Sequence, residues 1–253
     1  VIEFVTMIPI ILFVDEGRGA PPREGRSWLS IGLGAWGTDI LRQRSYVWLL
    51  VSRLFYLMSP TVLVFSGFFY LTQSLGYSVG ETGTALLIIT GIVGVTTGLT
   101  TLPAARLSDR IGRKRTIYGS IALGMIGMLG VALAPAFEVT VLFLVPVGIS
   151  AGAFLAVDWA LMTDIIPKAT TGRYMGISNV ATAISGPLGR LAAGPTLTIV
   201  LLLGLPADAD PVREADRSAT YALAPRVAMA LPVIFLTISA LTLTRVDERR
   251  RED

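Results

Sequence analysis

Long apolar segments separated by short polar ones are the main pattern along the chain. A helix that crosses a bilayer needs about 20 mostly apolar residues, and its backbone hydrogen bonds must close within the segment. Six segments meet or approach that length, and their ranges are Tyr46–Tyr70, Thr84–Ala104, Ile117–Ala134, Val139–Ile165, Met175–Leu203 and Ala219–Val246. The third is short for a span, and the fifth is long and contains two prolines. We therefore predict an all-α fold, a polytopic membrane helix bundle.

The residues before the first span also contain apolar positions. Residues 1–14 form an apolar stretch that begins without Met, carries Glu3 and lacks the basic leader and cleavage site of a signal peptide. We expect this stretch to be the tail of a truncated transmembrane helix. In the following segment, 15–45, four apolar residues recur at the spacing of one helical face and predict a helix on the inner membrane surface: Leu29, Leu33, Trp36 and Ile40. An irregular linker enriched in Gly and Trp explains the same segment equally well.

Composition narrows the classes of function. Only 15% of the 253 residues are charged, against roughly 25% in an ordinary soluble domain. The absence of Cys and His excludes disulfides, thiolate nucleophiles, imidazole bases and the commonest zinc ligands. We therefore expect no enzyme, no metal site and no cofactor. The net charge of +3 does not indicate a nucleic-acid partner, because the basic residues cluster between apolar segments instead of forming one solvated face.

The distribution of basic residues sets the expected orientation. Sixteen of the 21 Lys and Arg residues lie in alternate segments outside the spans, whereas only Arg213 and Arg217 lie in the remaining ones. Basic loops stay on the cytoplasmic side of a membrane. Segment 15–45 and the charged tail 247–253 are therefore expected in the cytoplasm, flanking a bundle over 46–246. This predicts a multi-pass protein of the inner or plasma membrane with a cytoplasmic C-terminus.

The most specific motif is the string ARLSDRIGRKR at residues 105–115, between the second and third predicted spans. Gly112 permits the tight turn that two closely joined helices need, and Asp109 suits a helix N-terminus. The string resembles the signature loop of the major facilitator superfamily, which reads Gly, three residues, Asp, Arg or Lys, any residue, Gly, Arg, and Arg or Lys. Ala105 replaces the leading Gly, and the positions that match are Asp109, Arg110, Gly112, Arg113 and Lys114.

The resemblance implies one half of a twelve-span carrier. Members of this superfamily have two six-span halves, and the signature loop acts as an inner latch that holds the halves together in the outward-facing state. Stretch 1–14 and the long charged segment after it resemble the end of the sixth span and the central linker. We therefore identify the chain as the C-terminal half, whose partner is a missing N-terminal six-span half or a second copy of the chain. Asp164 is expected either to pair with Arg113 or Arg173 as part of the latch, or to remain a solvated acid at a helix end.

Two opposite charges lie inside the predicted spans. Arg53 and Asp158 are each about seven residues, or about 10 Å, from the cytoplasmic ends of the first and fourth spans, so they are placed to meet. By the resemblance, these two spans line the central cavity. Either the two residues bind substrate or form a proton-sensitive gate, with Asp158 as the protonatable group, or they are a fixed ion pair. Trp159 and Phe154, on either side of the acid, are candidates for stacking on a sugar or an aromatic ring.

Other polar residues extend the candidate substrate and proton path. Ser52, Tyr56 and Ser59 share one face of the first span. This polar stripe either lines the cavity, or its serine hydroxyls bond back to their own helix. Asn179, in the fifth span, is a further cavity candidate.

The outer halves of the spans hold a candidate hinge. Gly186 and Pro187 interrupt the fifth span, and Arg190 follows them, so we expect a kink beside a buried charge. Arg226, in the sixth span, is expected to reach the lipid headgroups. Small residues at packing distance are expected to let helices approach closely, and they are Gly94 and Gly98, Gly148 and Gly152, and the run Gly124, Gly127 and Gly130.

These observations favour a secondary transporter. By the resemblance, it moves a small solute through alternating access, and it is driven by an ion gradient, of protons or Na⁺, or by the substrate's own gradient. A sugar or similar polar solute is the favoured substrate, with an exporter of drugs or amphiphiles as the alternative. A membrane scaffold or a truncated product that transports nothing is the alternative from another class.

Overall fold

The computed structural model describes Gly25, Ser27, Ile40, Arg42–Ile166, Thr171–Gly204 and Glu214–Asp247. The chain divides into two compact units, Val1–Gly37 and Thr38–Asp253, and every helix reported below belongs to the second. The expected helix tail at 1–14, the tail residues 248–253 and most of the expected surface helix lie outside the described residues. Of that surface helix, only Ile40 is described, and it is buried in the core of the second unit.

The second unit contains six long helices that are apolar enough to cross a membrane. They are α3 (Arg44–Phe69), which continues as the π-helical η2 (Tyr70–Ser74), α4 (Val79–Ile111), α5 (Arg113–Leu133), α6 (Phe137–Ile165), α7 (Thr171–Gly204) and α8 (Glu214–Leu243). All six predicted spans are therefore confirmed as helices, and the described residues form a membrane helix bundle without strands.

The helices are longer than their apolar cores, most of all α4. A capping box begins α4 five residues earlier than expected, because the Ser78 side chain accepts a hydrogen bond from the Glu81 backbone and the Glu81 carboxylate binds the Ser78 N–H. At the other end, the helix continues through Pro103 to Ile111. Helix α5 begins at Arg113 and reaches 21 residues, so the span that looked short is long enough. Hydropathy marks only the apolar part of each helix, whereas caps and turns decide where it ends.

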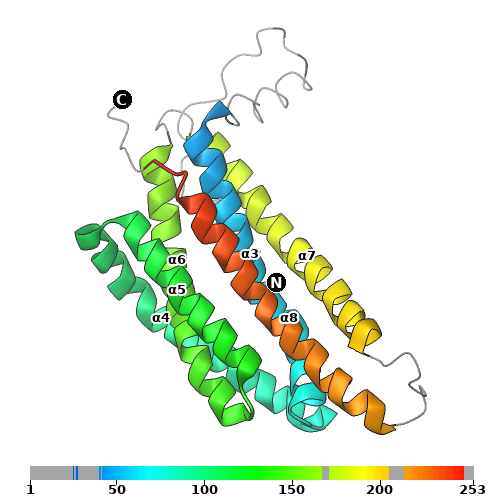
Figure 1. Cartoon of the computed structure of the whole chain (residues 1–253). Coiled ribbons are helices and arrows are strands. Elements are labelled where there is room, and N and C mark those ends of the chain that lie inside the picture. The colour runs from blue at the N-terminus through cyan, green and yellow to red at the C-terminus, as the bar shows by residue number, and fades with distance from the viewer. Residues whose placement is uncertain are drawn as a thin grey trace. The chain divides into compact units, whose positions relative to one another are not determined.

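The six helices pack as two groups of three, visible in Figure 1 as α3, α7 and α8 beside α4, α5 and α6. Helix α3 packs on α7 and α8, and α6 packs on α4 and α5, while α5 contacts α8 between the groups. If α3, α4 and α5 are replaced by α6, α7 and α8 in that order, and the reverse, the same pairs of helices are in contact. Such exchange is the mark of an internal repeat of three helices, which membrane transporters use.

Close helix approach depends on glycines at some of the expected positions. A Cβ at Gly152 of α6 would collide with the carbonyl oxygen of Thr97 on α4, and a Cβ at Gly127 of α5 would lie 2.9 Å from the carbonyl oxygen of Phe143. In contrast, a Cβ at Gly94 or Gly98 would meet nothing within 4 Å. The prediction is therefore confirmed for α5 and α6 and wrong for α4 within the described part of the chain, because these two glycines lie on the open face of that helix.

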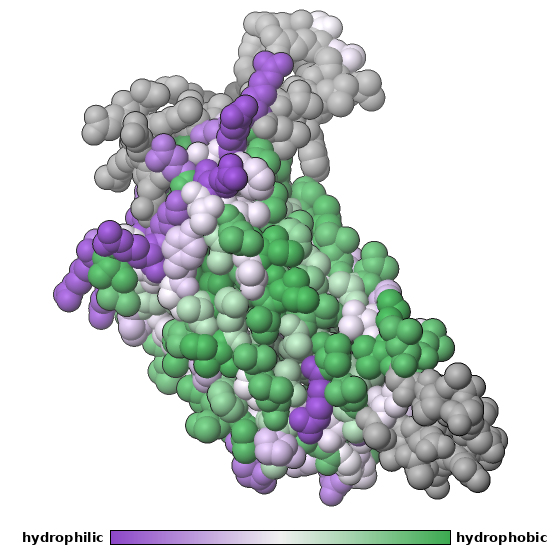
Figure 2. Space-filling model, in the orientation of Figure 1, coloured by the Kyte–Doolittle hydropathy of each residue, from purple (hydrophilic) through white to green (hydrophobic). Residues whose placement is uncertain are grey.

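Two helices keep most of their apolar surface uncovered. Only 11% of the most hydrophobic part of α4 and of α7 is buried, against 44–56% in the other four spans. Exposed residues on these two helices include Leu87, Val95, Leu99, Leu191 and Leu202. Figure 2 shows apolar residues over the middle of the bundle and hydrophilic ones toward its ends. Such a surface is suited to lipid or to further membrane helices.

Candidate functional site

The centre of the candidate site is an ion pair inside the bundle. Nη1 of Arg53, on α3, binds Oδ2 of Asp158, on α6, and only 3% and 2% of these side chains are exposed. The equal depths inferred from the sequence therefore correspond to a direct contact. Burial of both charges is tolerable because each neutralises the other.

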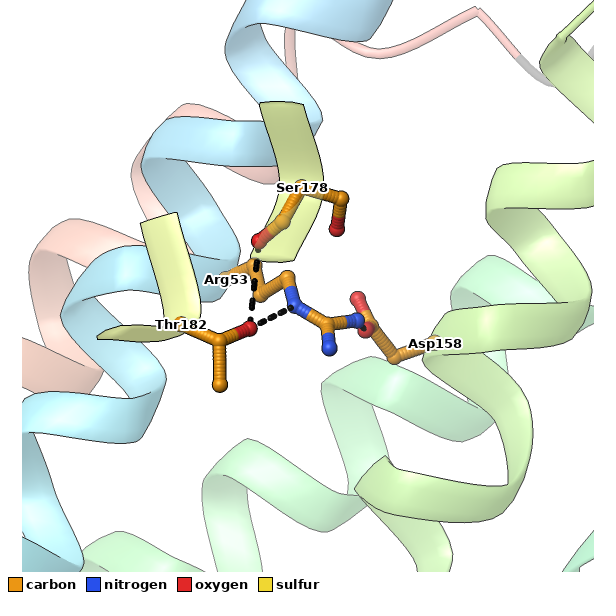
Figure 3. A network of polar contacts seen from close by, with 4 residues as sticks. All are labelled: Arg53, Asp158, Ser178 and Thr182. Atoms are coloured by element: carbon orange, nitrogen blue, oxygen red, sulfur yellow. Dashed lines mark hydrogen bonds and ion pairs between the residues drawn. The ribbon is translucent and has the colours of Figure 1, made fainter. Parts of the chain in front are cut away.

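Arg53 has two further partners besides the acid. Its Nε donates to Oγ1 of Thr182 on α7 over 3.2 Å, and Thr182 in turn donates to the carbonyl oxygen of Ser178 over 3.1 Å (Figure 3). The guanidinium carbon lies 4.3 Å from the ring centroid of Trp159, which is within the range of a cation–π interaction. Arg53 therefore joins α3, α6 and α7, and Trp159 binds this cation within the bundle.

Two polar atoms of this network are buried without a hydrogen-bond partner among the residues that the structure describes. They are Oδ1 of Asp158 and Oγ of Ser178. A carboxylate in this position has spare acceptor capacity, and buried polar atoms are normally satisfied by protein or ordered water. Asp158 therefore has one oxygen held by Arg53 and one available to accept a proton or a hydrogen bond.

Two residues of the polar stripe of α3 form hydrogen bonds to neighbouring helices. Oγ of Ser52 donates to the carbonyl oxygen of Ser239 on α8 over 2.9 Å, so this hydroxyl bonds to a neighbouring helix and not to its own. The Tyr56 hydroxyl lies 2.7 Å from Oγ of Ser150 on α6, and Ser150 donates to the carbonyl oxygen of Ser120 on α5. Two residues of the stripe thus bind α3 to its neighbours, because the stripe faces the bundle rather than an open cavity.

Aromatic stacking and a small cavity complete this inner layer. The ring of Tyr56 lies parallel to Phe154 with the two centroids 3.5 Å apart. Ser59 lines a cavity of about 30 Å³ together with Tyr56 and Ser150, a volume that suits about one water molecule. Phe154 and Trp159 each already stack on a residue of the bundle. The structure therefore does not support the expectation that they stand free to stack on a sugar.

Several residues of the site lie at positions of α7 that the sequence analysis did not single out. Ser178, Thr182 and Ser185 recur at the spacing of one helical face of α7, the same signal that marked the stripe of α3. This signal was available and was missed. Asn179 is exposed on α7, and no contact links it to Arg53 or Asp158.

A second unexpected cluster joins the inner ends of three helices. Nε2 of Gln43 donates to the carbonyl oxygen of Ile165 over 3.1 Å, and Oε1 of Gln43 accepts from the Tyr174 hydroxyl over 2.8 Å. The Tyr46 hydroxyl donates to the carbonyl oxygen of Tyr174 over 2.5 Å, and the two rings meet edge to face. No spacing rule predicts these contacts, because they join residues more than 120 positions apart.

The signature string is almost entirely helical. Gly112 alone separates α4 from α5, with φ +99° and ψ 144°, a conformation that is open to glycine and strained for other residues. Nε of Arg113 binds Oδ2 of Asp164 at 2.5 Å, with 27% of each side chain exposed. The sequence left open whether Asp164 pairs with Arg113, pairs with Arg173 or stays solvated, and the structure shows the pair with Arg113. Nζ of Lys114 donates to the carbonyl oxygens of Val246 over 2.6 Å and Thr244 over 3.3 Å, just after α8.

Two further latch residues, Asp109 and Arg110, are exposed. Asp109 and Arg110 lie exposed in the last turn of α4, so the expectation that Asp109 serves a neighbouring helix N-terminus is not met within the described residues. The reason is that α4 continues to Ile111, and its own carbonyl end lies beside the acid. Arg173 lies in the first turn of α7. Together these residues give the inner end of the bundle a charged surface.

The two outer arginines differ from each other. Nη1 of Arg226 donates to the carbonyl oxygen of Ala134 over 2.7 Å, and its guanidinium lies 5.9 Å from the Tyr70 ring centroid. The expectation that Arg226 reaches headgroups is therefore wrong, because this residue satisfies the free carbonyl end of α5. Arg190 is exposed rather than buried, and α7 continues as a helix through Gly186 and Pro187.

The arrangement can hold or release a charge in an apolar surrounding. In the described ranges, no group of three or more acidic, Cys or His side chains is placed to hold a metal ion. The Arg53–Asp158 pair instead offers a proton acceptor beside a fixed cation, between helices of different groups.

Comparisons with known proteins point to one family. The model of the Major Facilitator Superfamily matches residues 1–190 and 49–252. The chain is 33% identical over 81 residues to the "Putative metabolite transport protein YwtG" of Bacillus subtilis (strain 168), covering 32% of this chain and 18% of that protein. It is 26% identical over 91 residues to the "Uncharacterized MFS-type transporter MT1926" of Mycobacterium tuberculosis (strain CDC 1551 / Oshkosh), covering 36% and 13%. With YfkL of Bacillus subtilis (strain 168), an "Uncharacterized MFS-type transporter", it shares 27% identity over 96 residues, covering 38% and 22%. The matches thus span less than a quarter of each relative's length.

Proposed function

Because the chain belongs to the major facilitator superfamily, we propose that it acts in the secondary active transport of a small solute across the inner or plasma membrane. The observation that carries this proposal is the Arg53–Asp158 pair, buried between two groups of apolar helices. Ionisable residues within membrane spans are expensive and mark ion or substrate pathways. A bundle with no transport task has no need to bury such a pair.

Asp158 is the proton-carrying group in this proposal. When its free Oδ1 accepts a proton, the attraction between Asp158 and Arg53 falls, whereas Thr182 and Trp159 still hold the guanidinium. Thr182 then holds Arg53 to α7, whereas the link from Arg53 to α6 is reduced to the cation–π contact with Trp159. A proton thus alters the link between the two helix groups, which is what coupling to alternating access requires.

The uncovered faces of α4 and α7 support a partner for the bundle. In a twelve-span carrier, a second six-span half packs against the first, and the 11% burial of both helices leaves apolar surface for it. We propose that the other half of the carrier, or a second copy of this chain, occupies this surface. The charged inner ends, with the Arg113–Asp164 pair, then lie at the cytoplasmic side with the C-terminus.

Two classes of solute are candidates for transport. The sequence favoured a sugar-like solute, and the name of YwtG indicates metabolite transport for that protein. The preference for a sugar rested on the resemblance of the Asp158–Trp159 pair and the polar stripe of α3 to sugar and cation symporters of the superfamily. Trp159 and two residues of the stripe, Ser52 and Tyr56, have partners within the bundle. We therefore keep sugars and amphiphilic compounds as the two classes that a substrate screen must contain.

The experiment is uptake by the full-length protein in proteoliposomes under an imposed pH gradient. A panel of radiolabelled sugars and organic amphiphiles is supplied, and uphill uptake and solute exchange are measured separately. We expect Asp158→Asn to abolish uphill uptake and to retain exchange, because exchange needs no net proton movement. Glu138→Gln, an exposed acid at the other end of α6, is the matched control and keeps both activities.

Two results would contradict the proposal in different ways. Unchanged uphill uptake by Asp158→Asn would remove this residue from proton coupling. A folded wild-type protein that moves no member of the panel, with or without a gradient, would favour the scaffold alternative.

A further inference from the structure

A cavity of about 410 Å³ lies between α3 and α7, away from the ion pair. Its lining residues are Pro60, Thr61, Val64, Phe65, Gly186 and Arg190. Pro60 lies seven residues beyond Arg53 on α3, so the cavity is about 10 Å farther toward the outer side than the pair. Its volume is within the range of small-molecule sites, roughly 300–1,000 Å³.

Arg190 is the unusual member of this lining. Arg53, Arg190 and Arg226 lie away from the ends of the spans, and two of them have partners: Arg53 binds Asp158, and Arg226 binds the carbonyl oxygen of Ala134. No hydrogen bond or ion pair within the described residues satisfies Arg190, although it lies near the middle of the 34-residue α7. A guanidinium inside a span needs an anionic or polar partner. The cavity lies directly beside Arg190 and offers space for such a partner.

The other walls of the cavity are mostly apolar. Pro60, Val64 and Phe65 supply three hydrophobic contacts from α3, and Thr61 uses its hydroxyl on its own helix, donating to the carbonyl oxygen of Leu57. Gly186 leaves space on the α7 side, because a Cβ there would meet only Nη2 of Arg190, at 3.9 Å. A ligand that satisfies all of these walls combines one anionic group with an apolar body.

We propose that this cavity binds an amphipathic organic anion, whose acidic group pairs with Arg190 while its apolar part packs on Phe65 and Val64. The inference deepens the proposed transport function by naming a substrate class, and it rests on that function for its physiological meaning. The acidic group can belong to a soluble carboxylate or to the headgroup of an anionic lipid.

The test measures ligand binding by the full-length purified protein in detergent. The probes are three radiolabelled compounds of nearly equal shape: 4-phenylbutyrate, the neutral 4-phenylbutyramide and the cationic 4-phenylbutylamine. We expect saturable binding of phenylbutyrate and binding about tenfold or more weaker for the amide and the amine, because only the carboxylate carries a negative charge that pairs with the Arg190 guanidinium. Equal binding of the three probes, or no saturable binding of phenylbutyrate, overturns the proposal.

Two variants test the charge of Arg190 and the volume of the cavity separately. Arg190→Gln removes the charge and is expected to weaken phenylbutyrate binding about tenfold. Gly186→Leu keeps the charge, fills the cavity and is expected to abolish binding, while its better helix propensity supports folding. Arg115→Gln, an exposed basic residue at the inner end, is the matched control and binds as the wild type does. Wild-type affinity in either cavity variant overturns the proposal.

A comparison of two lipids shows whether the natural anion is a lipid headgroup or a soluble carboxylate. Phenylbutyrate binding is compared in nanodiscs of phosphatidylcholine and of phosphatidylglycerol. If phosphatidylglycerol competes, the anionic headgroup is the natural occupant, and if it does not, a soluble carboxylate is. Both results support an anion site at Arg190.

The outcomes distinguish this inference from the proposed function. Loss of phenylbutyrate binding together with Asp158-dependent transport of another solute overturns the site and leaves the transport function. Arg190-dependent binding by a protein that transports no solute overturns the transport function and leaves the site.

Discussion

Arg53 on α3 and Asp158 on α6 form an ion pair across the boundary between the two groups of three helices, with 3% and 2% of their side chains exposed. Each helix packs mainly on the members of its own group. The two helices also meet through Tyr56 of α3, which stacks on Phe154 and contacts Ser150 of α6. The ion pair is the charged part of this link. A change in the charge of Asp158 acts at the boundary rather than inside either group.

This pair predicts unequal effects of its two single substitutions on stability. Arg53→Leu leaves Asp158 charged, buried and unpaired, and is expected to cost about 3–5 kcal/mol. Asp158→Leu costs less, because Arg53 keeps its contacts with Thr182 and Trp159. The double substitution is expected to be more stable than Arg53→Leu alone. Thermal unfolding of the four proteins in detergent measures the cycle, and strictly additive effects would contradict a direct pair.

The latch pair predicts a much smaller effect. Arg113 and Asp164 are each 27% exposed at the inner end of the bundle, so solvent screens their attraction. Asp164→Asn is expected to change the free energy of unfolding by less than about 1 kcal/mol, and the change should shrink further at high salt. Melting temperatures at low and high ionic strength test this. A loss as large as that of Arg53→Leu would show that the pair is a structural support.

Replacing glycine by alanine is expected to change the stability of the protein in opposite directions at Gly112 and at Gly119. Its φ of +99° is strained for any residue with a Cβ, so Gly112→Ala is expected to destabilise the protein by about 1–3 kcal/mol. Gly119→Ala, farther along α5, is the control, because a Cβ there meets nothing within 4 Å. It should be neutral or stabilising by up to about 1 kcal/mol. Equal melting temperatures for both variants would mean that the α4–α5 turn relaxes without cost.

Gly152 makes the same kind of prediction for helix packing. A Cβ at this position collides with the carbonyl oxygen of Thr97 and lies 3.1 Å from Cβ of Thr100. Gly152→Ala is therefore expected to push α4 away from α6 and to cost about 1–3 kcal/mol. Gly98→Ala on the open face of α4 is the control and should not reduce the stability of the isolated bundle. Cross-linking between cysteines placed on α4 and α6 measures the separation, and unchanged yields in Gly152→Ala would refute it.

Local properties of the sequence determined the number of spans and the depth of their charged residues. The length of an apolar segment decides whether it crosses the membrane, and position along a helix converts directly into depth. For this reason Arg53 and Asp158 could be placed at one level from the sequence alone. Gly112 was predictable for a similar reason, since a turn of one residue between two helices requires a conformation that glycine adopts most easily.

Only the tertiary structure decided which neighbour each face of a helix meets. Gly94 with Gly98 and Gly148 with Gly152 have the same spacing, yet the second pair packs on α4 and the first faces outward. Ser52 has the sequence pattern of a cavity residue and binds Ser239 on α8 instead. Arg190 and Arg226 look alike in the sequence, but one lines a cavity and the other caps α5. A membrane helix is apolar on most sides whether it meets lipid or protein, so hydrophobic periodicity does not report its rotation. The rotation of each helix is set by the packing of all six, and it therefore decided the partners of these residues.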